Sequence, residues 1–379
     1  MTPLGSLVPI RGVDHRYDEK YSHQAFVPDA LPTTVELSTA AWAGVTAAQG
    51  DIARLDGAAG ELPDPMLLVA ALLRREAVTT SALEGTHTGF GDLLQAEVSG
   101  REARGDTREV LNYVHAAEQA IADLQHLPVC MRLLHDAHHR LLDGVRGDSS
   151  LTGTVRPGQN WIGPDECRIT EATFVPPPAD QVPDLLADWE RWIHRVDLPV
   201  LVRVAMGHVQ FETIHPYVDG NGRIGRLAIL LQLIEEGLLR HHLLALSGVL
   251  ERDRDTYIGQ LERVRKTGDW STWVQWFSLR LGEAARESHD RIIRAQDLTR
   301  RIVDDLRQSG QRGSVVQVAE GLVGHPVMTA PDVQRRLGVS YQTANEAIAK
   351  LVDQDTLVQV SEGNYNRTFA SLPMIAIFS

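Results

Sequence analysis

The segment from His215 to Arg226 combines residue types that could bind and transfer a phosphate group; it reads His-Pro-Tyr-Val-Asp-Gly-Asn-Gly-Arg-Ile-Gly-Arg. Pro216 disfavours helical geometry at the residue before it, so a preceding helix should end at His215. Gly220 and Gly222 permit positive φ angles and expose backbone N–H groups, and a helix should begin directly after them. Exposed amides at a helix N-terminus favour an anion. The spacing therefore predicts a phosphate-binding turn between two helices.

Charged side chains flank this predicted turn. Arg223 and Arg226 are three residues apart, so they share one helix face, and each guanidinium can grip phosphate oxygens with two bonds. Asp219 offers a hard carboxylate oxygen for Mg²⁺, and His215 is placed to take a proton from an incoming hydroxyl. No GxxxxGK[ST] sequence occurs in the chain, so the turn is not a Walker A loop. Each residue alone fits an ordinary turn or helix cap, but their combination within twelve positions favours a function.

The segment resembles the signature of the Fic (filamentation induced by cAMP) family, HPF-x-[D/E]-GNGR-x-x-R, with Tyr217 where Phe is usual. Residues 159–163, Gln-Asn-Trp-Ile-Gly, and residues 174–178, Phe-Val-Pro-Pro-Pro, resemble the target-docking flap of that family. Residues 211–214 are similar to the usual lead into the motif. Together with the two ends of the chain, the resemblance extends over nearly the whole sequence.

The resemblance implies that the protein binds ATP and Mg²⁺ and transfers AMP to a Ser, Thr or Tyr hydroxyl of a protein, itself included, with release of pyrophosphate. It assigns the general base to His215 and the Mg²⁺ ligand to Asp219. The implied ATP-binding residues are Gly220, Asn221, Gly222, Arg223, Ile224, Gly225, Arg226 and Tyr257. Within this set the turn holds the α- and β-phosphates, Arg223 assists the β-phosphate and Arg226 orients the γ-phosphate. Tyr257 lies in a segment similar to the adenine-side wall, and the implied target-docking residues are Trp161, Ile162 and Gly163.

Residues 80–85, Thr-Ser-Ala-Leu-Glu-Gly, fit the inhibitory pattern of the family, [S/T]-x-x-x-E-[G/N], which here begins at Thr80 and ends at Gly85. Because this segment precedes the Fic core, the resemblance implies the class with an N-terminal inhibitory helix. Glu84 would then pair with Arg226 and occupy the guanidinium that should hold the γ-phosphate. The alternative is a plain helix end with a solvated Glu and a glycine cap.

The pattern along the chain predicts a mainly α-helical protein with a C-terminal winged helix-turn-helix domain, and the resemblance implies a Fic-type helical core with a β-hairpin flap. Predicted domains are 1–105, an N-terminal arm and helical region with the inhibitory motif; 106–300, the Fic core; and 310–379, the winged helix. Residues 1–35 lack periodicity and should form an extended arm. In the last domain, helices are predicted at 330–337 and 341–352, and a hairpin at 357–369 with its turn at 362–364.

Composition and net charge exclude several classes of protein and of binding partner. The chain has 379 residues, of which 43% are hydrophobic and 23% charged, which excludes collagen-like, disordered and disulfide-scaffold classes. Its net charge of −13 makes it a poor general binder of nucleic-acid phosphates. Two cysteines without CxxC spacing indicate a reducing, cytoplasmic setting. We see neither a signal peptide nor an apolar run of the roughly 18–20 residues that cross a bilayer, so we expect no membrane partner.

The predicted winged helix invites a DNA-binding interpretation, but its charge opposes it. Residues 326–370 contain four basic and five acidic side chains, and a DNA reader needs clustered Lys or Arg. We therefore favour dimerisation or target recruitment. Three further alternatives stay open: removal of AMP by the same site with Glu84 positioning a hydrolytic water, a non-enzymatic transcriptional regulator, and transfer of another group. The sequence names neither the target nor the modified hydroxyl, and a homodimer is an expectation from the resemblance alone.

Overall fold

The computed structural model describes residues 3–14, 16–59, 64–98, 103–164, 166–361, 363 and 367–379. The chain forms two compact units, each assembled from separated stretches. Unit 1 consists of Met1–Gly50, His115–Leu238 and Arg252–Gly282, and unit 2 of Asp51–Val114, Leu239–Glu251 and Glu283–Ser379. The three-domain division predicted from the sequence stays a prediction.

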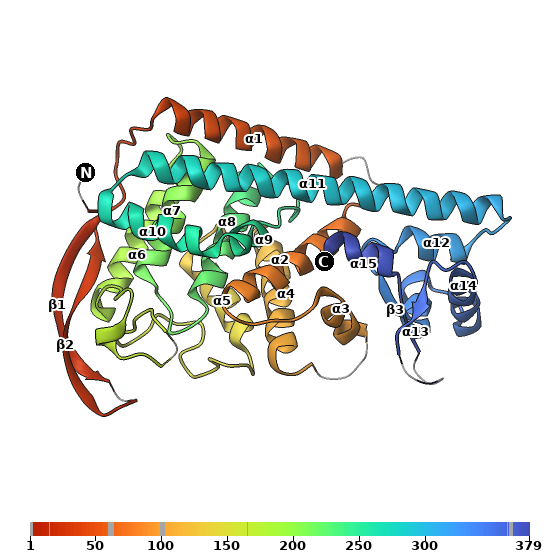
Figure 1. Ribbon diagram of the computed structural model, residues 1–379, viewed down its shortest axis with the longest axis horizontal. Helices are drawn as coiled ribbons and strands as arrows, with labels where there is room; N and C mark the ends of the chain where they lie inside the picture. Colours follow the sequence, from red (N-terminus) through yellow and green to blue (C-terminus); the bar gives the residue numbers. More distant parts are fainter. Residues whose placement is uncertain are drawn as a thin grey trace. The chain divides into compact units, whose positions relative to one another are not determined.

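The protein is mainly helical, as predicted (Figure 1). Helices α1 (Thr39–Ala59), α4 (Gly105–Asp123), α9 (Ser247–Arg252) and α11 (Trp270–Gln308) contribute residues to both units. The other elements of unit 1 are β1 (Gly5–Asp14), β2 (Glu19–Pro28), α5 (Met131–Leu142), α6 (Val182–Ile193), α7 (Val200–Ile214), α8 (Asn221–Glu235) and α10 (Arg254–Thr267), with 3-10 turns η1 (Ile169–Glu171) and η2 (Ala179–Gln181).

Helices α7 and α8 form the centre of unit 1, and almost every residue of both is buried. Two tryptophans fix α7 through its small residues. The indole of Trp189, on α6, donates to the carbonyl of Gly207 at 2.9 Å, and that of Trp273, on α11, donates to the carbonyl of Ala205 at 2.8 Å. A small side chain leaves the helix surface open, so a large ring can approach the backbone closely. The helix that ends at the candidate site is therefore anchored near its middle by two buried indoles.

The N-terminal segment differs from the extended arm expected of it. Strands β1 and β2 pair antiparallel over ten residues each, from Gly5↔Pro28 to Asp14↔Glu19, and form a two-stranded ribbon (Figure 1). Both faces of β1 stay partly exposed, so no clean polar–apolar alternation marks the strand in the sequence. The segment is extended, but hydrogen bonding between its two halves gives it regular structure.

Unit 2 contains the helices α2 (Met66–Leu83), α3 (Phe90–Val98) and α9 (Ser247–Arg252), the last of which ends one residue beyond it. Its C-terminal part contains α12 (Ser314–Glu320), β3 (Val327–Thr329), α13 (Ala330–Leu337), α14 (Tyr341–Asp353), β4 (Val358–Gln359), β5 (Thr368–Ala370) and α15 (Leu372–Phe378). Helix α15 packs on α2 and α3: the Arg75 side chain donates to the Phe378 carbonyl at 2.8 Å, and the rings of Phe90 and Phe378 stack at 6.3 Å.

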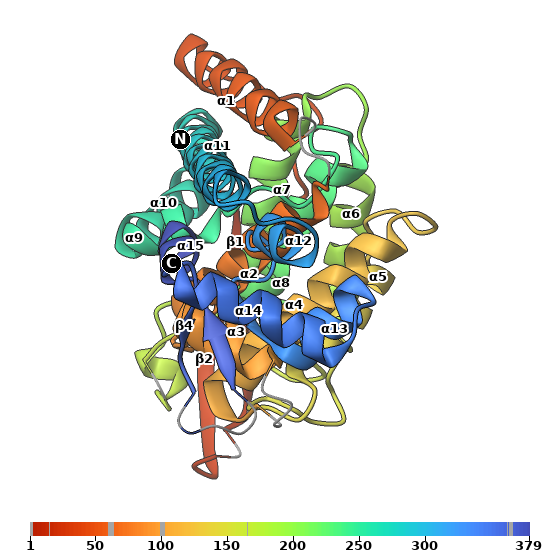
Figure 2. The ribbon, with the colours of Figure 1, turned by 90° about the vertical axis from the view of Figure 1, so that its right-hand side faces the viewer.

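The C-terminal elements occur in the predicted order (Figure 2). Helix α13 has the predicted bounds, between a Thr329 N-cap and Gly338 with φ 64°, and α14 begins at Tyr341 as predicted. Strands β4 and β5 pair antiparallel, which confirms a hairpin, and β3 adds a third strand that the sequence did not reveal. Of the predicted hairpin turn, 362–364, only Gly363 lies within the described residues. The interpretation as a winged helix stays a prediction.

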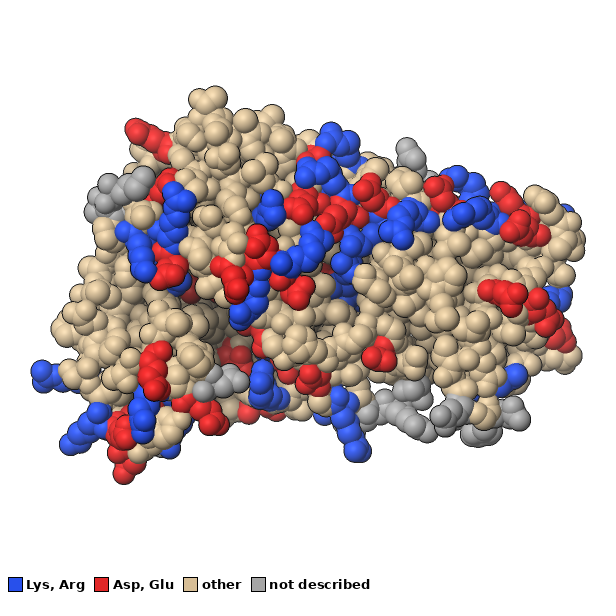
Figure 3. All heavy atoms as spheres, viewed as in Figure 1, with Lys and Arg blue, Asp and Glu red and all other residues tan. Residues whose placement is uncertain are grey.

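Surface charge in unit 2 is mixed rather than one-sided along α11. Figure 3 shows Lys and Arg interspersed with Asp and Glu over this helix. Ion pairs one turn apart account for part of the pattern, between Arg291 and Glu287 at 3.2 Å and between Arg300 and Asp297 at 3.0 Å. None of the helices in the described ranges has the length and apolarity that a membrane crossing requires.

Candidate active site

The turn between α7 and α8 has the predicted form. Helix α7 ends at His215, whose backbone is left-handed with φ 51° and ψ 64° and whose N–H still donates to the Phe211 carbonyl at 2.9 Å. Gly220, with φ 75°, is the N-cap of α8. A side chain at Gly220 would be strained by this φ and would lie 3.2 Å from Leu141. The helix therefore begins two residues before the predicted Arg223, with Asn221 in its first turn.

Asn221 braces the turn from inside. Its side-chain oxygen accepts the Tyr217 N–H at 2.7 Å, and its amide donates to the Tyr217 carbonyl at 2.9 Å. The same carbonyl accepts from Asn160 at 3.0 Å. Because Asn221 is only 2% exposed, its side chain is committed to the turn. Any contact with a ligand would have to come from backbone atoms at this position.

Tyr217 is fully buried, and burial raises the pKa of its hydroxyl. Its ring stacks on that of His138 with centroids 3.9 Å apart, and its hydroxyl lies 3.1 Å from Nδ1 of His135. The Phe-to-Tyr difference from the family signature therefore adds a polar contact to an otherwise apolar ring position.

His138 holds the backbone of the turn at Asp219. Its Nδ1 accepts the N–H of Gly153 at 2.8 Å, so the ring proton is on Nε2, which donates to the Asp219 carbonyl at 2.9 Å. Burial lowers the pKa of His138 to about 4, which keeps the ring neutral. The ring is thus occupied by two backbone groups. Within the described ranges, no three His, Cys, Asp or Glu side chains are grouped as metal ligands.

The charged groups of the turn lie at the boundary between core and solvent. Arg223 and Arg226 are almost fully buried, whereas the Asp219 side chain is 39% exposed. One Asp219 oxygen accepts the N–H of Gly220 at 2.6 Å and lies 3.7 Å from Nη2 of Arg223. An accessible carboxylate beside the predicted anion-binding turn fits Mg²⁺, which usually takes one or two protein carboxylates and completes its shell with phosphate oxygens and water.

Arg156 was not predicted from the sequence, and its side chain bonds several backbone carbonyls near the turn. It is 2% exposed, and its guanidinium donates to the carbonyls of His215 at 2.9 Å, Gly158 at 2.9 Å and Pro177 at 2.6 Å. Its backbone N–H donates to the Pro216 carbonyl at 2.9 Å. Burial lowers the pKa of Arg156 to about 10. One buried cation therefore joins the end of α7 to the backbone just before and just after the predicted flap, at Gly158 and Pro177. A lone Arg in a polar loop gives no sequence signal of that role.

The flap is a narrow hairpin, as predicted. Ile162 pairs antiparallel with Phe174: the Ile162 N–H donates to the Phe174 carbonyl at 2.8 Å, and the Thr173 N–H donates to the Ile162 carbonyl at 2.8 Å. The indole of Trp161 donates to the Cys167 carbonyl at 2.9 Å. At Gly163 a side chain would lie 2.6 Å from the Cys167 sulfur, so this glycine is required by a close approach.

Tyr257, the predicted adenine-side residue, lies in an aromatic cluster of unit 1. Its side chain is buried, and its hydroxyl is 2.7 Å from Nε2 of His208. The His208 ring lies nearly parallel to Tyr257, Trp273 and Phe277. Burial, with a smaller contribution from the charge of Arg226, lowers the pKa of His208 to about 3. The role of Tyr257 in nucleotide binding stays a prediction.

The predicted inhibitory residues lie at the end of α2, in unit 2. Thr80 is fully buried, and Glu84 is exposed at the C-cap, where its N–H donates to the Ser81 carbonyl at 3.0 Å. Gly85 follows with φ 84°, as a glycine after a helix end often does. The helix end predicted from the sequence is confirmed, and the inhibitory role stays a prediction.

Comparison with known proteins identifies two regions of the chain. Residues 42–122 match the Fic/DOC family N-terminal model, and residues 128–233 match the Fic/DOC family model. A probable protein adenylyltransferase of Aquifex aeolicus is 35% identical over 99 residues, 26% of this chain and 28% of that protein. The protein adenylyltransferase fic-1 of Caenorhabditis briggsae is 25% identical over 168 residues, 42% of this chain and 31% of that protein. The matches thus span less than a third of these relatives.

The fold is similar to that of a solved Fic family protein from Desulfovibrio desulfuricans G20. The TM-score is 0.58 at 22% identity, and the similarity covers 90% of this chain and 98% of that one. The motif of residues 215–226 lies inside the region that matches the Fic/DOC model. The chain therefore contains a Fic/DOC family domain at residues 128–233, preceded by a Fic/DOC family N-terminal region at residues 42–122.

Proposed function

We propose that this protein is an adenylyltransferase that moves AMP from ATP to a Ser, Thr or Tyr hydroxyl of a protein, including its own chain. The observation that carries the proposal is the turn at Gly220–Gly222, which opens α8 beside two buried arginines and follows His215 at the end of α7. The names of the relatives from Aquifex aeolicus and Caenorhabditis briggsae support the same reaction.

In the proposed reaction the target hydroxyl attacks the α-phosphorus of ATP and gives its proton to the His215 imidazole. The bond from the α-phosphorus to the bridging oxygen breaks, and pyrophosphate leaves. Backbone N–H groups of residues 220–222 would hold the α- and β-phosphates, while Arg223 and Arg226 would neutralise the β- and γ-phosphates. Bound Mg²⁺, held by Asp219, would neutralise further phosphate charge. Positioning and electrostatic stabilisation then supply most of the rate.

We further propose that the protein restrains itself. Glu84 would pair with Arg226, and ATP would then bind with its γ-phosphate displaced and its α-phosphate misaligned for in-line attack. The match of residues 80–85 to the inhibitory pattern, together with their place at the end of α2, supports this assignment. For residues 310–379 we propose a winged helix that serves dimerisation or target recruitment.

Incubation with labelled ATP and Mg²⁺ tests both proposals. Glu84→Gly should raise label transfer by about tenfold, which corresponds to about 1.4 kcal/mol of transition-state binding. The matched variant Glu84→Gln, which removes the charge but keeps the length, should raise it as well. His215→Ala should abolish transfer in every background. Equal labelling of all proteins would contradict the mechanism, and Glu84-dependent loss of AMP from a modified protein would indicate the reverse reaction instead.

A further inference from the structure

The flap, defined here as residues 161–175, is joined to the N-terminal ribbon β1–β2. The Phe26 N–H, on β2, donates to the Val175 carbonyl at 2.9 Å, so the end of the flap continues the hydrogen bonding of the ribbon. Ala25, which is fully buried, packs with Ile169 and Val175 in a small apolar cluster. The ribbon therefore supports the flap in addition to the bridge between Ile162 and Phe174.

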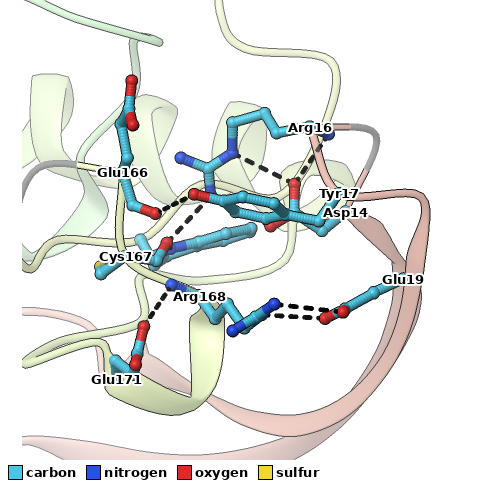
Figure 4. A network of polar contacts seen from close by, with 9 residues as sticks. Asp14, Arg16, Tyr17, Glu19, Glu166, Cys167, Arg168 and Glu171 are labelled. Atoms are coloured by element: carbon cyan, nitrogen blue, oxygen red, sulfur yellow. Dashed lines mark hydrogen bonds and ion pairs between the residues drawn. The ribbon is translucent and has the colours of Figure 1, made fainter.

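The tip of the ribbon, where β1 is followed by β2, contacts the flap at Cys167 through Arg16 (Figure 4). The Arg16 guanidinium makes two bonds to the Asp14 carboxylate, both of 3.1 Å, and a third to the Cys167 carbonyl at 3.1 Å. Its central carbon lies 4.7 Å from the ring centroid of Trp161. The same Cys167 carbonyl accepts from the Trp161 indole at 2.9 Å. The Cys167 carbonyl and the Arg16 guanidinium thus fix the ring of Trp161, the first residue of the flap.

Neighbouring contacts align the tip along residues 166–168. The Tyr17 hydroxyl donates to the Glu166 carbonyl, and Arg168 bonds Glu19 at 3.0 and 3.2 Å (Figure 4). Arg168 also lies 5.1 Å from the ring centroid of Tyr17. The pair of Arg168 and Glu19 is half exposed, so it contributes little stability by itself. These contacts mainly set the register between tip and flap.

We propose that the ribbon tip is a positioning device for target docking, in which Arg16 holds Trp161 and Cys167 so that the flap edge at Trp161–Gly163 meets an extended segment of the target protein in one orientation. This inference rests on the proposed adenylyl transfer. A short isolated hairpin is marginally stable in water, so an edge with one bridge needs outside support. Because the ribbon already holds the flap edge in place, less conformational entropy is lost when a target segment adds to that edge as a strand.

The test uses the full chain with Glu84→Gly as the parent enzyme. The acceptor is a tagged copy of this chain carrying His215→Ala, which can receive AMP but not transfer it. Adding Arg16→Ala to the parent should raise the KM for this acceptor about fivefold, as expected for the loss of one or two hydrogen bonds. The kcat and the KM for ATP should stay within about twofold, since Arg16 has no place in the chemical step.

Two companion variants separate positioning from loss of charge. Arg16→Lys keeps the charge but not the planar fork, so its acceptor KM should lie between those of the parent and Arg16→Ala. Arg11→Ala removes an exposed arginine from strand β1 of the same ribbon, away from the tip, and should leave the acceptor KM unchanged. Equal KM values for Arg16→Ala and Arg11→Ala would overturn the proposal.

Amide hydrogen exchange gives a readout that does not depend on the reaction. In Arg16→Ala the amides of Ile162, Thr173 and Phe174 should exchange about tenfold faster, because the flap opens more often. Faster exchange with an unchanged acceptor KM would assign Arg16 a purely structural role and refute its part in docking. If the parent enzyme does not label the acceptor at all, the result counts against adenylyl transfer. That outcome differs from a failure of the Arg16 proposal, in which the parent is active and Arg16→Ala has the same acceptor KM.

Discussion

Replacing Arg156 by methionine tests whether one buried cation holds the site in shape. The guanidinium bonds the carbonyls of His215, Gly158 and Pro177, which come from separate places, and makes a longer contact of 3.5 Å with the Ile214 carbonyl. Methionine has a similar length and no charge, so it removes the donors without leaving a large cavity. The three carbonyls would then lose their shared partner inside the protein.

The magnitude follows from two opposing contributions. Three hydrogen bonds to a charged group stabilise the fold by about 7 kcal/mol in total. Burial opposes this, since it lowers the pKa of Arg156 from 12.5 to about 10, a penalty of about 3 kcal/mol. Arg156→Met should therefore lower the free energy of unfolding by about 4 kcal/mol. Urea unfolding followed by circular dichroism measures the change.

The matched control is Arg203→Met. Arg203 is equally buried and bonds the Ile193 carbonyl at 2.7 Å and Glu236 at 2.6 Å, but none of its bonds reaches the turn or the flap. Both variants should lose stability, and AMP transfer is then measured per folded molecule. Arg156→Met should lose about tenfold in kcat because the His215 backbone is released, whereas Arg203→Met should keep the parent value. A wild-type kcat for folded Arg156→Met would refute the reasoning.

Three further changes probe the fold and the site. The pKa of His208 falls to about 3 in the fold but is 6.5 in the unfolded chain, so its neutral ring gives stability above pH 6.5 that is lost as the pH falls. Between pH 6.5 and 5 the wild type should lose about 2 kcal/mol of unfolding free energy more than His208→Phe, as measured by urea titration at both pH values. Gly220→Ala should cost about 1–2 kcal/mol through its positive φ and also weaken ATP binding in equilibrium dialysis, whereas Gly237→Ala, with a similar φ in open space, should cost stability alone. Phe378→Ala should destabilise the protein by about 3–4 kcal/mol and speed amide exchange in α2, and Leu372→Ala, 53% exposed, should do neither in a thermal and exchange assay.

The parts of the fold that the sequence predicts are those set by neighbouring residues. Pro216 ends α7, Gly220 opens α8, and Thr329 and Gly338 bound α13, so these elements follow from local rules. The ribbon β1–β2 was expected only as an extended arm, because each strand is stabilised by the other and neither shows a clean alternation. The third strand of the C-terminal sheet is three residues long, too short to leave a pattern.

The supports of the candidate site escaped prediction for a different reason, which is distance along the chain. Arg156 meets the His215 carbonyl across 59 positions, and His138 meets the Asp219 carbonyl across 81. A motif reports which groups are available, but not which distant side chain orients them. His138 is an example, because its two ring nitrogens bond backbone atoms of Asp219 and Gly153, which lie far from it in the sequence or in another loop.

The side chains that support the turn all donate hydrogen bonds to its backbone carbonyls, and this affects how the turn could bind an anion. The carbonyls of His215, Tyr217 and Asp219 accept hydrogen bonds from Arg156, Asn160 and His138 respectively. Oxygens committed to buried donors are turned into the protein, so they do not present negative dipoles to an approaching phosphate. The amides of the turn then dominate its outer face, together with the positive end of α8. The predicted anion site therefore depends on two features of the turn. The glycines expose its backbone amides, and the buried donors occupy its backbone carbonyls.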